Sequence, residues 1–173
     1  MILSVSRRTD IPAFYMPWFM NRLREGYVMV RNPMNYHQVS RVSLSPEVID
    51  CMVFWTKNAM PLTPHLGKIA LQYPFYIQYT LNPYGRDLEP GLPPLAQRLA
   101  NARAIAEQFG SKHVVWRYDP IMLTEQYTAD WHIEQFAAMA DALFFSTRRR
   151  PPSSTRAPTT PPGRASSSTS RSS

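Results

Sequence analysis

Five apolar runs in the first 120 residues each end abruptly in a polar cluster, and this pattern constrains the fold more than any other feature. The first run, residues 2–5, leads into two arginines, a threonine and an aspartate before Pro12. The other four cover residues 27–30, 51–55, 75–81 and 113–116. Short apolar runs bounded by turn residues are typical of strands buried in a parallel sheet.

Helical patterns separate these runs. One helix is expected from Pro17 to Gly26, a short one follows over residues 62–69, and the clearest one spans residues 94–109 before Gly110. Thr128 can cap a last helix, whose predicted inner face consists of Ile133, Phe136, Ala137 and Ala140. Residues 37–44 alternate between apolar and polar types and predict a short extended segment.

Strands that alternate with helices indicate an α/β fold in which helices cover the faces of a parallel sheet. About five such units are a little more than half of a (β/α)₈ barrel. The pattern therefore predicts a partial, TIM-barrel-like (β/α) domain, and an open doubly wound sheet is the alternative that fits it equally well.

The composition divides the chain into residues 1–145 and a tail of residues 146–173. The tail consists of Ser, Thr, Arg, Pro, Ala and Gly, and it is predicted to be disordered because it has no large apolar side chain to bury. It also carries six of the 19 basic residues and no acidic one, which leaves 13 basic against 12 acidic residues in 1–145. The net charge of +7 is thus poor evidence that the folded part binds nucleic acid or a membrane.

The carboxyl ends of parallel strands meet at one edge of a sheet, so the polar clusters are expected to form one site. Five cations but only two carboxylates fall there, which predicts a phosphate or carboxylate group on an anionic substrate. Asp10 and Asp119 are the candidate catalytic residues, as a general base or by orienting a neighbouring arginine. The candidate substrate-binding residues are Arg7, Arg8, Thr9, Arg31, Asn32, Lys57, Asn58, Arg117 and Tyr118. Structural pairing of Arg7 with Asp119, or of Arg8 with Asp10, is the alternative interpretation.

Other kinds of site have little support. The four histidines lack metal-ligand spacing, and the single cysteine, Cys51, lies in an apolar run, so no metal site and no disulfide are expected. The connection over residues 82–94 is long for a βα loop, which favours a functional or lid role. The N-terminus has no signal-peptide pattern and no apolar stretch is long enough to span a membrane, so a cytoplasmic protein is predicted.

Several strings distributed over residues 2–143 together resemble the bacterial family named domain of unknown function 1848. They are SVSRRTDIPAF, FMNRLREGYVMVRNP, VSLSP, FWTKN, YTLNPYG and WRYDPI. The resemblance implies a partial or complete TIM-type barrel. It also implies an iron–sulfur cluster held by a C-terminal cysteine cluster in full-length relatives, and this chain lacks those cysteines.

The α/β pattern stops at Leu143, in what should be the middle of a helix. A truncation or a reading-frame shift is the preferred explanation. The first hypothesis is therefore the N-terminal part of a barrel-type enzyme that binds an anion, has no cofactor of its own and tends to self-associate. The second is a small α/β module whose basic tail binds nucleic acid.

Overall fold

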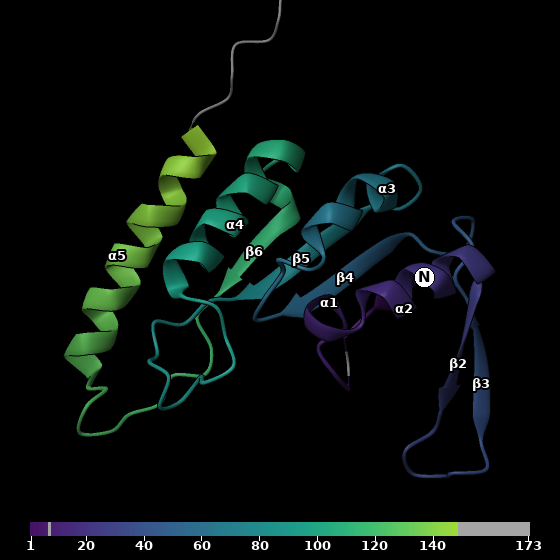
Figure 1. Cartoon of the computed structure of the whole chain (residues 1–173), viewed down its shortest axis with the longest axis horizontal. Helices are drawn as coiled ribbons and strands as arrows, with labels where there is room; N and C mark the ends of the chain where they lie inside the picture. The colour runs from purple at the N-terminus through teal and green to yellow at the C-terminus, as the bar shows by residue number, and fades with distance from the viewer. Residues whose placement is uncertain (7, 149–173) are drawn as a thin grey trace, which may run out of the picture.

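The computed structural model describes residues 1–6 and 8–148, and its centre is a four-stranded parallel sheet (Figure 1). Its strands are β1 (Ile2–Ser4), β4 (Cys51–Thr56), β5 (Phe75–Thr80) and β6 (Val114–Arg117). Their order in the sheet is β1-β4-β5-β6, which is also their order along the chain. The prediction of an α/β fold with a parallel sheet is confirmed. The reversal of strand order that characterises a doubly wound sheet does not occur among these strands.

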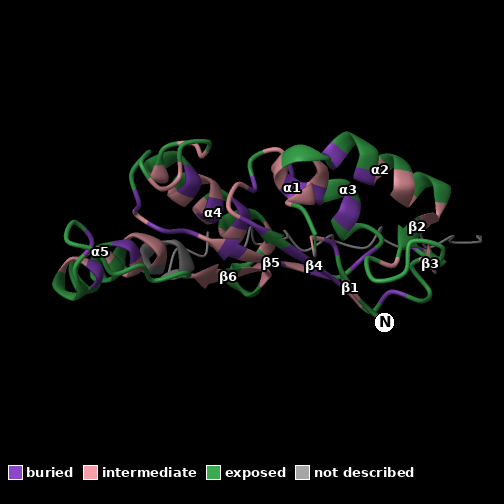
Figure 2. Ribbon diagram, turned by 90° about the horizontal axis from the view of Figure 1, so that it is seen from below, coloured by how far each residue is buried: buried purple, intermediate pink, exposed green. Residues whose placement is uncertain are grey.

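Helices connect the strands and lie on one side of the sheet. The chain passes from β1 through α1 (Ile11–Phe14) and α2 (Met16–Glu25), and Gly26 ends α2 with a φ of 76° in the left-handed region. The connection from β4 to β5 holds a 3₁₀ turn, η1 (Thr63–His65), and α3 (Leu66–Ala70). The connection from β5 to β6 holds α4 (Leu95–Phe109) and a second 3₁₀ turn, η2 (Ser111–His113). Figure 2 shows α1 to α4 together above the sheet.

One predicted strand does not belong to this sheet. Residues 27–31 form β2 (Tyr27–Arg31), which pairs antiparallel with β3 (Val39–Ser43) in a separate two-stranded hairpin. The hairpin lies beyond β1 at the end of the molecule (Figure 2). The prediction of Tyr27–Val30 as a strand of the main sheet was wrong, because β2 pairs along its whole length with the alternating segment that follows it in the chain.

The two faces of the parallel sheet differ sharply. The face toward the helices, called here the helix-covered face, carries Leu3, Met52, Phe54, Thr56, Phe75, Ile77, Tyr79, Val114 and Trp116. Met52, Phe54, Ile77 and Tyr79 are completely buried in the core beneath α2, α3 and α4. No helix of the described chain covers the opposite face, called here the open face, so the expectation of helices on both faces was wrong.

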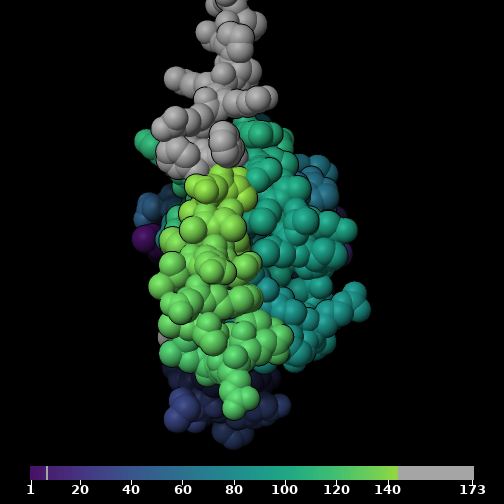
Figure 3. Space-filling view, turned by 90° about the vertical axis from the view of Figure 1, so that its left-hand side faces the viewer, coloured from purple at the N-terminus to yellow at the C-terminus, as the bar shows by residue number. Residues whose placement is uncertain are grey.

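The last helix, α5 (Ala129–Arg148), lies alongside α4, as the space-filling view shows (Figure 3). Thr128 caps it as predicted, through a 3.2 Å bond from the Trp131 N–H to Oγ1. Its predicted inner face was wrong, since Ile133 is 67% exposed whereas His132 and Met139 are buried. The described helix runs three residues beyond the predicted boundary at residue 145, so the prediction of disorder was wrong for residues 146–148, and the rest of the predicted tail, residues 149–173, lies outside the described residues.

None of the helices in the described part of the chain is both long enough and apolar enough to cross a membrane.

Candidate functional site

The best-formed polar cluster at the carboxyl edge of the sheet joins Arg117 and Asp119 to the ring of Trp55. The Arg117 guanidinium lies over the Trp55 indole, 4.8 Å from its centroid, and donates to Asp119 Oδ2 at 2.6 Å. Arg117 extends from the end of β6 and Trp55 from β4, so the contact reaches across β5. All three side chains are accessible: Trp55 is 38% exposed, and the side chains of Arg117 and Asp119 are 33% and 55% exposed.

Strand register places this cluster on the open face. Trp55 pairs with Gln78, Gln78 with Val115, and Thr80 with Arg117. Neighbouring residues in register project to the same side of a sheet, so an amide and a hydroxyl lie between the indole and the guanidinium. The cluster thus offers a cation, a carboxylate, an aromatic ring and two neutral hydrogen-bonding groups at the end of the strands where α/β proteins bind their ligands.

The backbone of Asp119 is fixed by the buried side chain of Asn82. The Asn82 amide donates to Asp119 O at 2.8 Å and accepts from Asp119 N at 3.0 Å. The Asp119–Pro120 peptide is cis, and Pro120 O accepts from the Tyr84 hydroxyl at 2.7 Å. Asp119 therefore presents an exposed carboxylate on a backbone held from two sides.

Asp10, the other candidate catalytic residue, is occupied by structural contacts. Its Oδ1 caps α1 by accepting from Ala13 N at 2.9 Å. Its Oδ2 accepts from Thr56 Oγ1 at 2.8 Å and from Lys57 N at 3.1 Å, which ties the end of β4 to the start of α1. Three hydrogen bonds hold the Asp10 carboxylate in a fixed place, so Asp10 positions the edge of the sheet.

Lys57 pairs with a carboxylate that sequence reasoning missed. Its Nζ lies 2.6 Å from Glu89 Oε1, in the long connection over residues 82–94. The Glu89 side chain is only 6% exposed, and its Oε2 lies 3.6 Å from Arg98 Nη2. Arg98 is 2% exposed, and burial lowers its pKa while Glu89 opposes that change.

Arg98 and Tyr127 hold this connection in place. Arg98 Nε donates to Pro93 O at 3.1 Å and Nη2 to Asn82 O at 3.2 Å. The Tyr127 hydroxyl donates to the Asp87 carboxylate at 2.9 Å and accepts from Gly85 N at 3.3 Å. The connection predicted to be a lid is therefore anchored to α4 at one point and to the segment before α5 at another.

Tyr118 and Asn58 also make internal contacts. The Tyr118 hydroxyl lies 2.8 Å from His132 Nδ1, and His132 Nε2 lies 3.1 Å from Met122 O. A carbonyl oxygen only accepts, so the neutral ring is protonated at Nε2 and Tyr118 donates to Nδ1. Burial, with a smaller effect of Tyr84, raises the pKa of Tyr118. Asn58 Oδ1 accepts from Met60 N at 3.1 Å, which stabilises a turn.

The remaining predicted residues do not join the cluster. Arg31 donates to Tyr36 O at 2.7 Å and stacks over the Tyr36 ring, and Asn32 Nδ2 donates to Gln38 at 2.6 Å. Both stand at the tip of the hairpin, so their predicted place at the edge of the parallel sheet was wrong. Arg8 and Thr9 are exposed and line a pocket beside β1, whereas Arg7 lies outside the described residues.

These contacts reduce the excess of positive charge that the sequence predicts at this edge. Lys57 is neutralised by Glu89 and Arg117 by Asp119, while Arg31 stands elsewhere. Glu89 was missed because it lies in a loop nine residues after β5, and Trp55 because it looked like an ordinary core residue of an apolar run. The strings FWTKN and WRYDPI were the available signals for Trp55, Arg117 and Asp119.

The described residues do not fit an iron–sulfur cluster. Such clusters are held by several cysteine thiolates, and Cys51 is the single cysteine in the chain. Its Sγ lies 3.6 Å from Met52 O, and burial raises the pKa of the thiol. No group of three or more His, Cys, Asp or Glu suited to a metal ion occurs within the described ranges.

Comparison with known families assigns most of the chain. Residues 2–153 match the family described as Domain of unknown function (DUF1848), which confirms the resemblance carried by the sequence strings. The chain belongs to the DUF1848 family. No curated protein and no solved structure matches it. The DUF1848 match extends beyond Leu143, where the sequence predicts a break, and includes the whole cluster of Trp55, Arg117 and Asp119.

Proposed function

We propose that this DUF1848 chain is the N-terminal part of a barrel-type enzyme domain that binds an anionic small molecule on its open face. The single observation that carries the proposal is the accessible cluster of Arg117, Asp119 and Trp55 at the carboxyl ends of the strands. In a (β/α) barrel the helices lie outside, so the open face would become the interior and its carboxyl end the mouth.

Each residue of the cluster then has a role. Arg117 binds a phosphate or carboxylate of the substrate, because a guanidinium presents several donors in one plane. Trp55 keeps that plane fixed by stacking beneath it. Asp119 orients Arg117 in the free protein and serves as general base when the substrate anion takes its place on the guanidinium.

The arrangement of the strands supports a barrel over an open sheet. Four parallel strands follow one another in chain order with helices on one side, which is the repeat of a (β/α) barrel. β1 and β6 each have one strand neighbour among the described residues. Unpaired strand edges associate readily, so we expect the isolated chain to self-associate. A chain that is a monodisperse monomer by light scattering and that melts cooperatively would contradict the barrel proposal.

The anion site is tested by titrating the full chain with phenyl phosphate, whose ring and charge suit Trp55 and Arg117. Arg117→Ala is expected to weaken binding about tenfold or more, because a hydrogen bond to a charged group contributes about 1.5–3 kcal/mol. Arg24→Ala removes an exposed arginine from α2 and serves as the control. Unchanged binding together with a large drop in melting temperature for Arg117→Ala would show that the pair is structural instead.

A further inference from the structure

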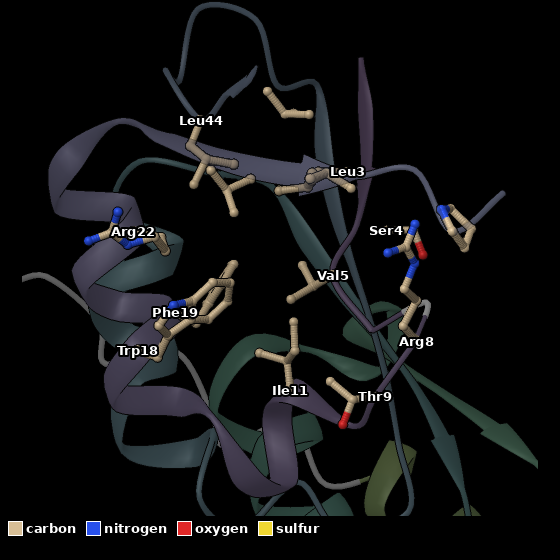
Figure 4. Close-up of a pocket in the computed structure, with 14 residues that line it drawn as sticks. Leu3, Ser4, Val5, Arg8, Thr9, Ile11, Trp18, Phe19, Arg22 and Leu44 are labelled. Carbon is tan, nitrogen blue, oxygen red and sulfur yellow. The ribbon is translucent and has the colours of Figure 1, made fainter. Parts of the chain in front are cut away.

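A cavity lies away from the Arg117 cluster, between β1, α2 and the β2–β3 hairpin (Figure 4). Its volume is about 570 Å³. Pockets that bind small organic molecules typically measure about 300–1,000 Å³ and bury most of their ligand. The size therefore suits a small organic ligand better than a single ion.

The middle of the pocket is apolar. Ten of its fourteen lining residues are apolar, and they come from all three walls: Val5 follows β1, Phe19 belongs to α2, and Val28 and Val42 belong to the hairpin. Figure 4 shows Val5, Phe19 and Leu44 around the same space. Apolar walls offer water no hydrogen bonds, so the hydrophobic effect favours a ligand whose apolar part displaces that water.

One end of the pocket is polar and basic. Ser4, Arg8 and Thr9 gather on one side of the space in Figure 4, and Arg22 lies on the opposite side. No acidic residue is among the fourteen lining residues that the structure describes. At this end Arg8 is exposed and has no ion-pair partner among the described residues. The charge of the site thus calls for an anion.

We propose that this pocket binds a small amphipathic anion, a carboxylate with an acyl or aryl body. The apolar body occupies the space between Val5, Phe19 and Val42, and the carboxylate pairs with Arg8 beside Ser4 and Thr9. A neutral apolar molecule would leave the arginine without a partner, and a small inorganic anion would leave the apolar walls exposed. The site is independent of the Arg117 cluster, since β1 and the hairpin supply its walls.

The test is calorimetric titration of the full chain with octanoate, with 1-octanol and acetate as matched probes. Octanol has the same chain without the charge, and acetate has the charge without the chain. Octanoate is expected to bind saturably with one molecule per chain, octanol about tenfold more weakly because it lacks the charge-assisted bond, and acetate with no measurable heat.

Two variants locate the binding. Arg8→Gln is expected to weaken octanoate about tenfold and to leave octanol unchanged, whereas Arg24→Gln changes neither. Val42→Trp fills the cavity from the hairpin and should abolish the binding of both octanoate and octanol. Circular dichroism shows whether this variant folds. If it does not fold, the result for Arg8→Gln decides the test. Arg117→Ala should leave octanoate binding intact. Octanoate that binds no tighter than octanol, binds without saturation, or is unaffected by Arg8→Gln would overturn the proposal.

Discussion

The two faces of the parallel sheet are built from the same short strands, yet they differ in burial and in the side chains that they leave accessible. Phe54 and Trp55 are adjacent in β4, but Phe54 is completely buried under the helices whereas Trp55 is 38% exposed beneath Arg117. On the helix-covered face Tyr79 pairs its hydroxyl with the covering helix, by donating to Asn101 of α4. The open face leaves a cation, a carboxylate and an aromatic ring accessible. The largest buried side chains of the sheet therefore lie on one face and the candidate chemistry on the other.

The largest expected effect compares these two neighbours directly. Phe54→Ala should lower the free energy of unfolding by about 3–5 kcal/mol, because it removes a fully buried ring that contacts Phe19 and Phe75. Trp55→Ala, the matched change on the open face, should lower the free energy of unfolding by less than half as much. Chemical denaturation monitored by circular dichroism measures both, and equal losses would show that the open face is a core as well.

Two arginines sharpen the same contrast. Arg98→Met should destabilise the fold by about 3 kcal/mol, since it leaves buried Glu89 with one partner fewer and two carbonyl oxygens without their donor. Arg117→Met should cost less than about 1 kcal/mol, because its pair with Asp119 is accessible to solvent. Similar losses of unfolding free energy for the two variants would contradict the division between the faces.

The buried hydroxyl of Tyr79 predicts a loss of stability at high pH. Burial is the main reason that the pKa of Tyr79 rises to about 12, from an ordinary value of about 10. The folded state then holds its proton more tightly than the unfolded state, so this stability is complete below pH 10 and is lost as pH rises toward 12. The loss would be about 2–3 kcal/mol at most.

Melting temperature followed between pH 9 and 12 measures this effect. Tyr79→Phe should flatten the decline relative to the parent protein, although other tyrosines, such as buried Tyr73 and partly buried Tyr118, keep part of it because their pKa values are also raised. Tyr76→Phe, on the open face, is the control and should leave the slope unchanged. An identical slope in all three proteins would refute the assignment to Tyr79.

The smallest expected effect decides between two roles for Tyr118. Tyr118→Phe should lower the free energy of unfolding by about 1 kcal/mol, because it removes the donor to buried His132. Phenyl phosphate binding should remain the same. If the variant has normal stability but binds phenyl phosphate more weakly, Tyr118 is a substrate-binding residue, as its position after β6 predicts.

Much of the fold could be predicted from the sequence because it depends on local patterns. The boundaries of α2 and α4 follow from Pro17, Gly26, Pro94 and Gly110, and each main strand is an apolar run that ends in a polar cluster. The inner face of α5 could not be predicted in this way. His132 is buried there because Tyr118 and Met122 O satisfy both of its ring nitrogens, and those contacts come from another part of the chain.

The candidate site was predictable only as a set of residue types at strand ends. Arg117 and Asp119 lie where the sequence predicts them. Asp10, however, caps α1 and accepts a hydrogen bond from Thr56 at the end of β4, and Lys57 pairs with Glu89. The bond from Lys57 N to Asp10 joins residues 47 positions apart, and the pair of Lys57 with Glu89 joins residues 32 positions apart, so no local pattern shows either contact.

The sequence by itself determined the α/β class, most of the elements and membership of the DUF1848 family, because hydrophobic periodicity, caps and motif strings are local properties. Only the tertiary structure decided that β2 leaves the sheet for a hairpin, that one face of the sheet has no helix over it among the described residues, and which charges remain accessible. Pairing of strands and pairing of charges depend on what the folded chain brings together, and for that reason the open face and the pocket beside β1 could be identified only in three dimensions.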